Sequence, residues 1–153
     1  MKTLNELKLA QELIRFKSTL TEDKGLMKFL SKKLSSIGFK CKIIKSKGAG
    51  SKPALNLYAR IGKSKPHFNY LGHTDVVANL NGWEIPPFKG LVKNGFLHGR
   101  GAQDMKGGVA CFISAMSKFV ANKKFKGSIS MIIAADEETT GLGTPAVMRY
   151  LRK

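Results

Sequence analysis

The sequence predicts an α/β protein, and three observations support that class. Apolar residues recur at helical spacing over residues 4–17 and 26–37, near the amino terminus. Strand-like apolar runs follow, among them 67–72 and 128–135. Between those two runs lies a third helical pattern, over 105–120, and strands that alternate with helices are typical of α/β folds. With 153 residues and no repeat or internal linker, the chain is expected to form one domain with a sizeable core.

The amino-terminal part predicts two helices. The apolar stripe of the first helix is preceded by Thr3, whose hydroxyl can cap a helix amino terminus. The second helix is expected to begin after Thr21. Gly38 is its stop signal, because glycine readily adopts the left-handed conformation that ends many helices. We interpret both helices as scaffold.

Two strands are expected after these helices. Residues 39–43 and 55–61 alternate between apolar and polar side chains, which is the period of a strand with one buried face. The glycine-containing segment 48–51 is expected to form the loop between them. Residues 62–66 then turn the chain into the next strand.

The second half predicts a hairpin, two helices and a buried strand. An Asn-Gly pair within 90–98 is the strongest hairpin signal in the chain. A helix is expected to begin at Met105. The run 128–135 is almost continuously apolar, so we expect it to be covered on both faces of a sheet. A last helix is expected to start at Thr144, with proline at its first helical position.

The net charge of +17 is the strongest global feature of the composition. Such a charge favours polyanionic partners, so a basic nucleic-acid-binding module is an alternative of a different class. The lysines are scattered, however, and no aromatic residues are interleaved with them in the manner of RNA-binding motifs. We interpret the lysines as a solvated surface whose field would attract a small anionic substrate, and we expect no nucleic-acid partner.

Composition also bears on location. No apolar stretch approaches the roughly 18 residues that a membrane span needs, and the amino terminus lacks the apolar core of a signal peptide. Cys41 and Cys111 have neither metal-ligand nor redox spacing, so we expect both to be reduced and buried. The expected compartment is the cytoplasm, with no membrane partner.

Three short pieces of the chain hold half of its acidic residues. Only ten residues are acidic, and five of them follow or interrupt apolar runs. These five are Asp75, Asp104, Asp136, Glu137 and Glu138. So local a concentration of carboxylates in a basic protein indicates a site.

Each piece is ambiguous alone, and their combination is informative. A histidine such as His73 is commonly a structural hydrogen-bonding residue, and Asp104 alone would be a helix cap. Residues i and i+2 of a strand face the same way, so His73 and Asp75 can address one place. Three consecutive acids at 136–138 are unfavourable unless cations neutralise them. One imidazole and several carboxylates therefore predict a divalent-metal site, with zinc or cobalt as the metal.

The three pieces resemble the co-catalytic zinc metallopeptidase and deacylase family, which includes desuccinylases, acetylornithine deacetylases, carboxypeptidase G2 and aminoacylases. The resemblance spans essentially the whole chain and is greatest to the succinyl-diaminopimelate desuccinylases. It is carried by Gly72-His73-Thr74-Asp75, Trp83 with Pro86-Pro87, Asn94 to Ala102, Asp104-Met105-Lys106-Gly107-Gly108, Asp136-Glu137-Glu138 and Gly143-Thr144.

The resemblance implies a role for each site residue. His73 matches a ligand of one zinc ion, Glu138 a ligand of the other, and Asp104 the carboxylate that bridges both. Asp75 matches the residue that orients the His73 ring, and Glu137 matches the general base. A cis peptide bond is implied between Asp104 and the residue after it.

The resemblance also implies a fold and a reaction. The fold is a zinc-peptidase-like mixed β-sheet flanked by helices. The reaction is hydrolysis of N-succinyl-LL-2,6-diaminopimelate, a small anionic succinylated amino acid, to succinate and LL-diaminopimelate in lysine biosynthesis. Acetylornithine deacetylase is the alternative within the family, and an inactive remnant is a further one.

The family pattern continues beyond what this sequence contains. It includes another acidic ligand, a carboxyl-terminal histidine, and a lid or dimerisation domain. Residues 1–153 are therefore expected to be the amino-terminal part of an incomplete catalytic domain, and the complete enzyme a homodimer. We expect this part alone to bind metal weakly, to turn over little substrate, and to expose an unpaired sheet edge.

Overall fold

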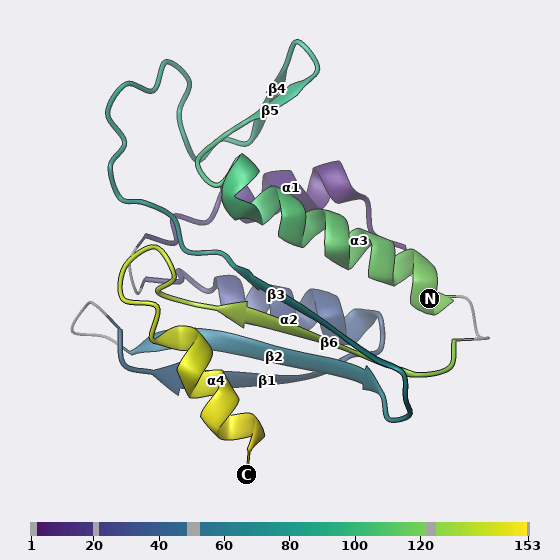
Figure 1. Ribbon diagram of the computed structural model, residues 1–153. Coiled ribbons are helices and arrows are strands. Elements are labelled where there is room, and N and C mark those ends of the chain that lie inside the picture. The colour runs from purple at the N-terminus through teal and green to yellow at the C-terminus, as the bar shows by residue number, and fades with distance from the viewer. Residues whose placement is uncertain (1–2, 20–21, 49–52, 122–124, 153) are drawn as a thin grey trace.

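The structure is a computed structural model that describes residues 3–19, 22–48, 53–121 and 125–152. Its centre is a four-stranded mixed sheet in the order β1-β2-β6-β3 (Figure 1). The antiparallel neighbours β1, β2 and β6 are followed by β3, which runs parallel to β6. The strands are β1 (Lys40–Ser46), β2 (Ala54–Gly62), β3 (His67–His73) and β6 (Ser128–Ala134). The predicted α/β class with a mixed sheet is confirmed.

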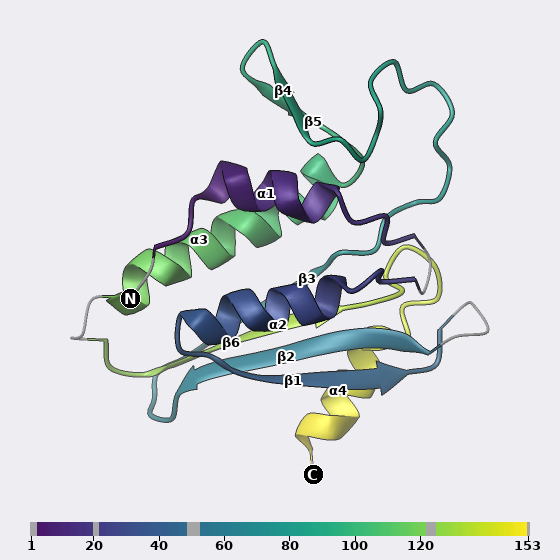
Figure 2. The ribbon, with the colours of Figure 1, turned by 180° about the vertical axis from the view of Figure 1, so that it is seen from behind.

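Helices cover both faces of the sheet. Helix α4 lies in front of the sheet in Figure 1 and behind it in Figure 2, whereas α2 lies on the opposite side in both views. The large core joins α1, α2 and α3 to one face of the sheet, through residues such as Leu57 and Met131. A smaller cluster of Ile44, Ile132 and Val147 lies under α4. The helices are α1 (Glu6–Ile14), α2 (Leu26–Ser36), α3 (Gly107–Ala121) and α4 (Gly143–Leu151).

The position of β6 in the sheet explains why most of its residues are apolar. All seven of its residues are buried, because strands flank it on both edges and helices cover both faces. The prediction of a strand covered on both faces is confirmed.

The predicted hairpin is also present, as β4 (Leu91–Lys93) and β5 (Phe96–His98), which project away from the sheet (Figure 1). Asn94 and Gly95 both have positive φ, at 53° and 80°. Tight two-residue hairpin turns need this conformation, and asparagine and glycine adopt it at low cost. The loop 77–90 precedes the hairpin and leads the chain away from β3.

The helix caps differ in part from the prediction. Asn5, and not Thr3, caps α1, because the Asn5 side chain accepts a hydrogen bond from the Lys8 backbone N–H at 2.8 Å. The helix ends at Ile14, so the apolar positions beyond it belong to an irregular segment. Thr21 and most of the predicted loop 48–51 lie outside the described residues.

The start of α3 is less regular than the sequence suggests. A π-helical turn, η1 (Ala102–Lys106), precedes α3, and the Asp104–Met105 peptide bond in it is cis, as the resemblance implied. Gly101 has a φ of 80°, and a Cβ there would lie 2.7 Å from Val76. The helix predicted from Met105 therefore begins regularly only at Gly107, and Asp104 has an extended backbone.

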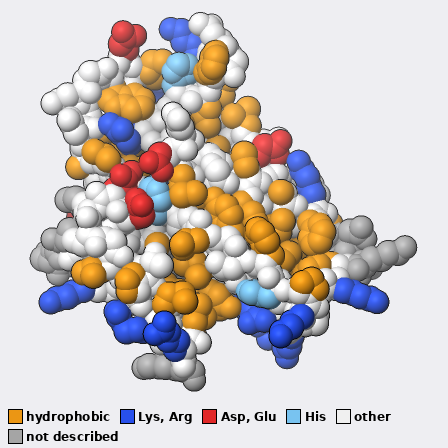
Figure 3. Space-filling view, in the orientation of Figure 1, with side chains coloured by type: hydrophobic (Ala, Val, Ile, Leu, Met, Phe, Trp, Pro, Cys, Tyr) orange, Lys and Arg blue, Asp and Glu red, His pale blue; other side chains and the backbone are white. Residues whose placement is uncertain are grey.

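The two edges of the sheet differ in charge. Edge strand β1 carries Lys40, Lys42 and Lys45, which discourage pairing with another strand. Strand β3, the other edge within the described part of the chain, contains no Lys, Arg, Asp or Glu. Phe68 and Leu71 on β3 are half exposed, and apolar side chains gather on this face (Figure 3). The expectation of an exposed, apolar edge is confirmed.

Two remaining expectations concern cysteines and membranes. Both cysteines are free thiols, but Cys111 is exposed and Cys41 is partly buried, so the expected burial is wrong. Cys111 points away from the core because it lies on the solvent side of α3, between the buried Ala110 and Ile113. Among the described residues, no helix is long and apolar enough to span a membrane.

Candidate metal centre

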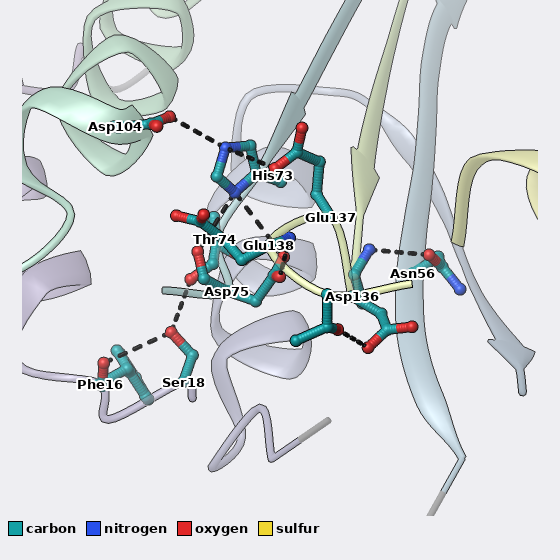
Figure 4. A network of polar contacts seen from close by, with 12 residues as sticks. Phe16, Ser18, Asn56, His73, Thr74, Asp75, Asp104, Asp136, Glu137 and Glu138 are labelled. Atoms are coloured by element: carbon teal, nitrogen blue, oxygen red, sulfur yellow. Dashed lines mark hydrogen bonds and ion pairs between the residues drawn. The ribbon is translucent and has the colours of Figure 1, made fainter. Parts of the chain in front are cut away.

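The candidate site lies where two parallel strands end side by side. In the parallel pairing of β3 and β6, His73 lies opposite Ala134, so both strands end at the same end of the sheet. Loops at the carboxyl ends of parallel strands are where α/β sheets place ligand sites. The loop after β6 brings Glu137 and Glu138 next to His73, and the turn before α3 adds Asp104 (Figure 4).

His73 is at the centre of this group. Its ring is buried, with 5% of the residue exposed, and its Nε2 lies 3.0 Å from Asp104 Oδ1 and 3.6 Å from Glu137 Oε2. Its other nitrogen, Nδ1, lies 3.2 Å from the Asp75 backbone oxygen. One ring nitrogen therefore faces the carboxylates and solvent, and the other faces the protein.

Three of the predicted residues have the donors and spacing that a metal ion requires. One ligand atom each from His73, Asp104 and Glu138 can be chosen so that all lie within 4.8 Å of one another. Ligand atoms that share one ion at about 2.0–2.2 Å are at most about 4.4 Å apart, so these atoms would move only slightly closer on binding one. Asp104 is largely exposed, so the group faces open space. Imidazole nitrogen and carboxylate oxygen suit divalent zinc and its neighbours, so these residues fit such an ion.

The charges of the site favour a cation. Burial lowers the pKa of His73, but the hydrogen bond and charge of Asp75, followed by Asp104 and Glu137, outweigh burial and raise this pKa to about 9. Burial and the charge of Asp104 raise the pKa of the Glu138 carboxyl. The carboxylates therefore repel one another, and a divalent ion would relieve that repulsion.

Asp75 connects two parts of the site. Its Oδ1 lies 3.7 Å from His73 Nδ1, and its Oδ2 accepts a hydrogen bond from the Glu138 backbone N–H at 3.0 Å. The residue is almost fully buried. The Asp75 backbone oxygen and the nearby carboxylate charge therefore hold the imidazole with Nε2 outward, and the carboxylate fixes the loop that carries both glutamates.

Asp136 does not belong to the charged group. Its side chain is fully buried and accepts hydrogen bonds from the hydroxyls of Thr139 and Thr140 (Figure 4). Its φ of 66° turns the chain sharply at the end of β6. The expectation of three clustered charges at 136–138 is therefore wrong for Asp136, because the turn directs its carboxylate inward.

Sequence reasoning assigned no role at the site to Lys106 or Ser18, which support it from outside the ligand group. Lys106 is fully buried, and its Nζ donates to the Phe16 backbone oxygen at 2.7 Å. Burial lowers the pKa of Lys106 to about 8, although the charge of Asp75 acts in the opposite direction. Lys106 thus ties the turn that carries Asp104 to the segment after α1. Ser18 reinforces that segment, since its hydroxyl donates to the Thr74 backbone oxygen at 2.6 Å.

Asn56 is a third residue that sequence reasoning missed. It is fully buried in β2, and its Oδ1 accepts from the Ala135 backbone N–H at 2.8 Å (Figure 4). Its Nδ2 donates to the Ile44 backbone oxygen at 3.1 Å. Asn56 therefore fixes the start of the loop that carries the two glutamates. The one available signal was a polar residue at a buried position of an alternating strand.

The remaining histidines lie apart from this group. Both ring nitrogens of His67 contact serine hydroxyls, Ser128 at 2.8 Å and Ser130 at 3.0 Å. His98 lies on β5 and, with Trp83, lines both a cavity at the hairpin and the cavity that reaches Asp104 and Glu138. Neither belongs to the three-residue ligand group found among the described residues.

The fold and the site together define an α/β protein with a group of possible divalent-metal ligands where β3 and β6 end. The chain belongs to Peptidase family M20/M25/M40, whose sequence profile matches residues 70–153. Membership implies a divalent metal, and His73, Asp104 and Glu138 could hold it.

Curated relatives resemble the whole chain. This chain is 50% identical over 157 residues to the succinyl-diaminopimelate desuccinylase of Pelagibacter ubique (strain HTCC1062). The match covers 100% of this chain and 41% of the relative. The succinyl-diaminopimelate desuccinylase of Parvibaculum lavamentivorans is 42% identical over 148 residues. That match covers 95% of this chain and 37% of the relative. The chain thus spans about two fifths of the length of these relatives.

Solved structures share the fold at lower sequence identity. Human carnosine dipeptidase 1 matches with a TM-score of 0.83 and 23% identity, covering 95% of this chain and 34% of that one. The dipeptidase Dug1p of Saccharomyces cerevisiae matches with a TM-score of 0.81 and 21% identity, covering 95% and 34%. At this sequence identity, the likeness to these two structures shows the fold alone.

Proposed function

We propose that this chain is the metal-binding part of an amidohydrolase that converts N-succinyl-LL-2,6-diaminopimelate and water to succinate and LL-2,6-diaminopimelate. The observation that carries the proposal is the meeting of His73, Asp104 and Glu138 within 4.8 Å at the edge of the sheet. The choice of substrate is supported by relatives of up to 50% identity that are named for this reaction.

The ligand roles in this proposal follow the resemblance. His73 would bind one zinc ion through Nε2, Glu138 would bind a second, and Asp104 would bridge them, with cobalt as the alternative metal. When bound, the ions would polarise the scissile carbonyl and make the attacking water more acidic. Asp75 would act as a positioning residue, because it holds the His73 ring with Nε2 toward the ligand group.

Glu137 is the proposed general base. Its carboxylate is about half exposed and lies 3.6 Å from His73 Nε2, next to the ligand group. From there it can take a proton from the water that attacks the amide carbon. It then delivers this proton to the departing nitrogen, so that the C–N bond breaks and the amine leaves neutral. Adjacent glutamates can serve different roles because consecutive side chains diverge in an extended segment.

The proposal includes a larger protein. Residues 1–153 would be the amino-terminal part of the catalytic domain, and a further acidic ligand, a histidine and a lid or dimerisation domain would complete a cytoplasmic homodimer. The chain alone would bind metal weakly and turn over little substrate. Neither nucleic acid nor membrane is a partner in this proposal.

The test is succinate release by a polypeptide that continues this chain to the length of its relatives. Zinc-loaded protein should release succinate from N-succinyl-LL-2,6-diaminopimelate faster than it releases acetate from N-acetylornithine. The His73→Ala variant should release neither. Preference for N-acetylornithine would replace the desuccinylase assignment with the deacetylase alternative, and no release from either would overturn the proposed reaction.

A further inference from the structure

We propose that a cavity beside the metal centre binds a carboxylate of the substrate through the guanidinium of Arg100. This inference rests on the proposed function, and it names the group that would select an anionic substrate. Arg100 belongs to none of the ligand or base positions discussed above.

The cavity connects the metal centre to a single arginine. Its volume is about 460 Å³, within the range of small-molecule sites. Asp104 and Glu138, two members of the ligand group, form part of its wall. The wall also includes Trp83, His98 and Arg100, from the loop and hairpin that precede α3. A molecule in this cavity can therefore touch Arg100 and the metal centre together.

Arg100 has a charge that the described protein does not neutralise. Its Nη2 donates to the Asn79 backbone oxygen at 2.6 Å, but this acceptor is uncharged. Its Nε is buried and has no hydrogen-bond partner among the described residues. Among the described residues, no carboxylate lies within ion-pair distance of the Arg100 guanidinium. A partly buried guanidinium with an unused donor is expected to bind an anion, because leaving it unpaired is costly.

The guanidinium is also held in place. It lies over the Trp83 ring at 5.2 Å, and the Arg100 backbone N–H donates to the Pro87 oxygen at 2.7 Å. Little side-chain freedom would be lost on binding, which favours affinity. The planar guanidinium fork matches the two oxygens of a carboxylate better than a lysine ammonium would.

The charge distribution in the cavity predicts cooperation with the metal. Asp104 and Glu138 repel an anion while they are unneutralised, and a divalent ion bound between them would remove that repulsion. A substrate with a carboxylate at one end and an amide near the ions would satisfy both ends of the cavity. Succinylated amino acids have this arrangement, whereas neutral amides lack the group that Arg100 would bind.

The experiment uses Trp83, the single tryptophan of the chain, as a reporter. Succinate is titrated into the zinc-loaded chain while tryptophan emission is followed, and neutral succinamide is titrated in parallel. The variants are Arg100→Gln, Arg100→Lys and, as matched control, Arg60→Gln on the inner strand β2, whose Nη2 donates to the Ser128 hydroxyl at 3.3 Å. Thermal midpoints and zinc affinity are measured for each variant, so that loss of folding or metal is recognised.

The expected result is selective. Succinate should change the Trp83 emission, and Arg100→Gln should weaken succinate binding at least tenfold while zinc affinity changes by less than twofold. Arg100→Lys should retain intermediate binding, and Arg60→Gln should behave as the parent chain does. Equal succinate affinity in Arg100→Gln and Arg60→Gln would overturn the inference. An equal effect of Arg100→Gln on succinamide would do the same.

A second arm separates this inference from the proposed function. In a chain with Asp104→Asn and Glu138→Gln, the repelling carboxylates are neutral and no metal is needed. Succinate binding to that chain should still depend on Arg100, and independence from Arg100 would overturn the inference. Failure of the parent chain to bind zinc, with Arg100 dependence kept in this arm, would count against the metal centre alone.

Discussion

The Asp75 carboxylate accepts a hydrogen bond from the Glu138 backbone N–H at 3.0 Å, while its other oxygen lies 3.7 Å from His73 Nδ1. One buried side chain thus sets the distance between the end of β3 and the loop after β6. Residues that orient a metal-binding imidazole contribute strongly to affinity, because they fix its ring and its tautomer.

Replacing Asp75 should therefore weaken metal binding without removing a ligand. We expect Asp75→Asn to lower zinc affinity by about 10- to 100-fold. The amide can still accept from Glu138, but it no longer carries the charge next to His73 Nδ1. Isothermal titration calorimetry measures the change. Glu12→Gln, which affects a surface ion pair with Lys33, is the control and should leave zinc affinity unchanged. Equal affinity in both variants would contradict a positioning role.

Glu137→Gln should separate metal binding from turnover. The amide cannot accept the proton of the attacking water, so hydrolysis by the extended polypeptide should fall by about 10²- to 10⁴-fold. Zinc affinity should stay close to that of the parent, because Glu137 is outside the ligand group. Succinate release and calorimetry are measured on the same preparation. Turnover near the parental rate would remove Glu137 from the role of base.

Lys106→Met should destabilise the fold. The change removes the hydrogen bond from Lys106 Nζ to the Phe16 backbone oxygen, which still accepts from the Ser18 backbone N–H at 2.9 Å, and this loss costs about 0.5–1.5 kcal/mol of unfolding free energy. Removal of a buried charge offsets part of that cost, so we expect a net loss at the lower end. Urea unfolding of this variant is compared with Lys32→Met, an exposed lysine on α2. A loss no larger than that of Lys32→Met would show that the tether is dispensable.

Glu6 should make stability depend on acid pH. Its backbone hydrogen bond, followed by the Ser114 hydroxyl and Lys118, lowers its pKa from 4.5 to about 2. Because the folded pKa lies below the unfolded value, the stabilising contribution is present above pH 4.5 and is lost as pH falls toward 2. Glu6→Gln should therefore be less stable than the parent at pH 6, and the difference should shrink by pH 3. A difference that is constant over this interval would exclude the linkage.

Local patterns were sufficient for much of the fold. The Asn-Gly pair at 94–95 predicted the hairpin because its backbone preference acts within two residues. The nearly continuous apolar run at 128–135 predicted the fully buried β6, in which the two serines, Ser128 and Ser130, contact the His67 ring. Capping was harder, since Thr3 and Asn5 lie two residues apart and both residue types can cap a helix, and the structure uses Asn5.

The sequence predicted the residues that could bind a metal ion, but not the residues that support them. His73, Asp104 and Glu138 follow or interrupt apolar runs, and a family resemblance connected them. Lys106 and Asn56 contact residues 90 and 79 positions away, so no local pattern could connect them to the site. Asp136 was misassigned for a related reason, because its direction depends on one positive φ.

The most direct test is an anomalous-difference map from crystals of this chain grown with zinc. We predict a peak about 2.0–2.2 Å from His73 Nε2 and from carboxylate oxygens of Asp104 or Glu138. A well-occupied zinc peak elsewhere on the molecule, with none at these three side chains, would contradict the metal centre on which the proposed function depends.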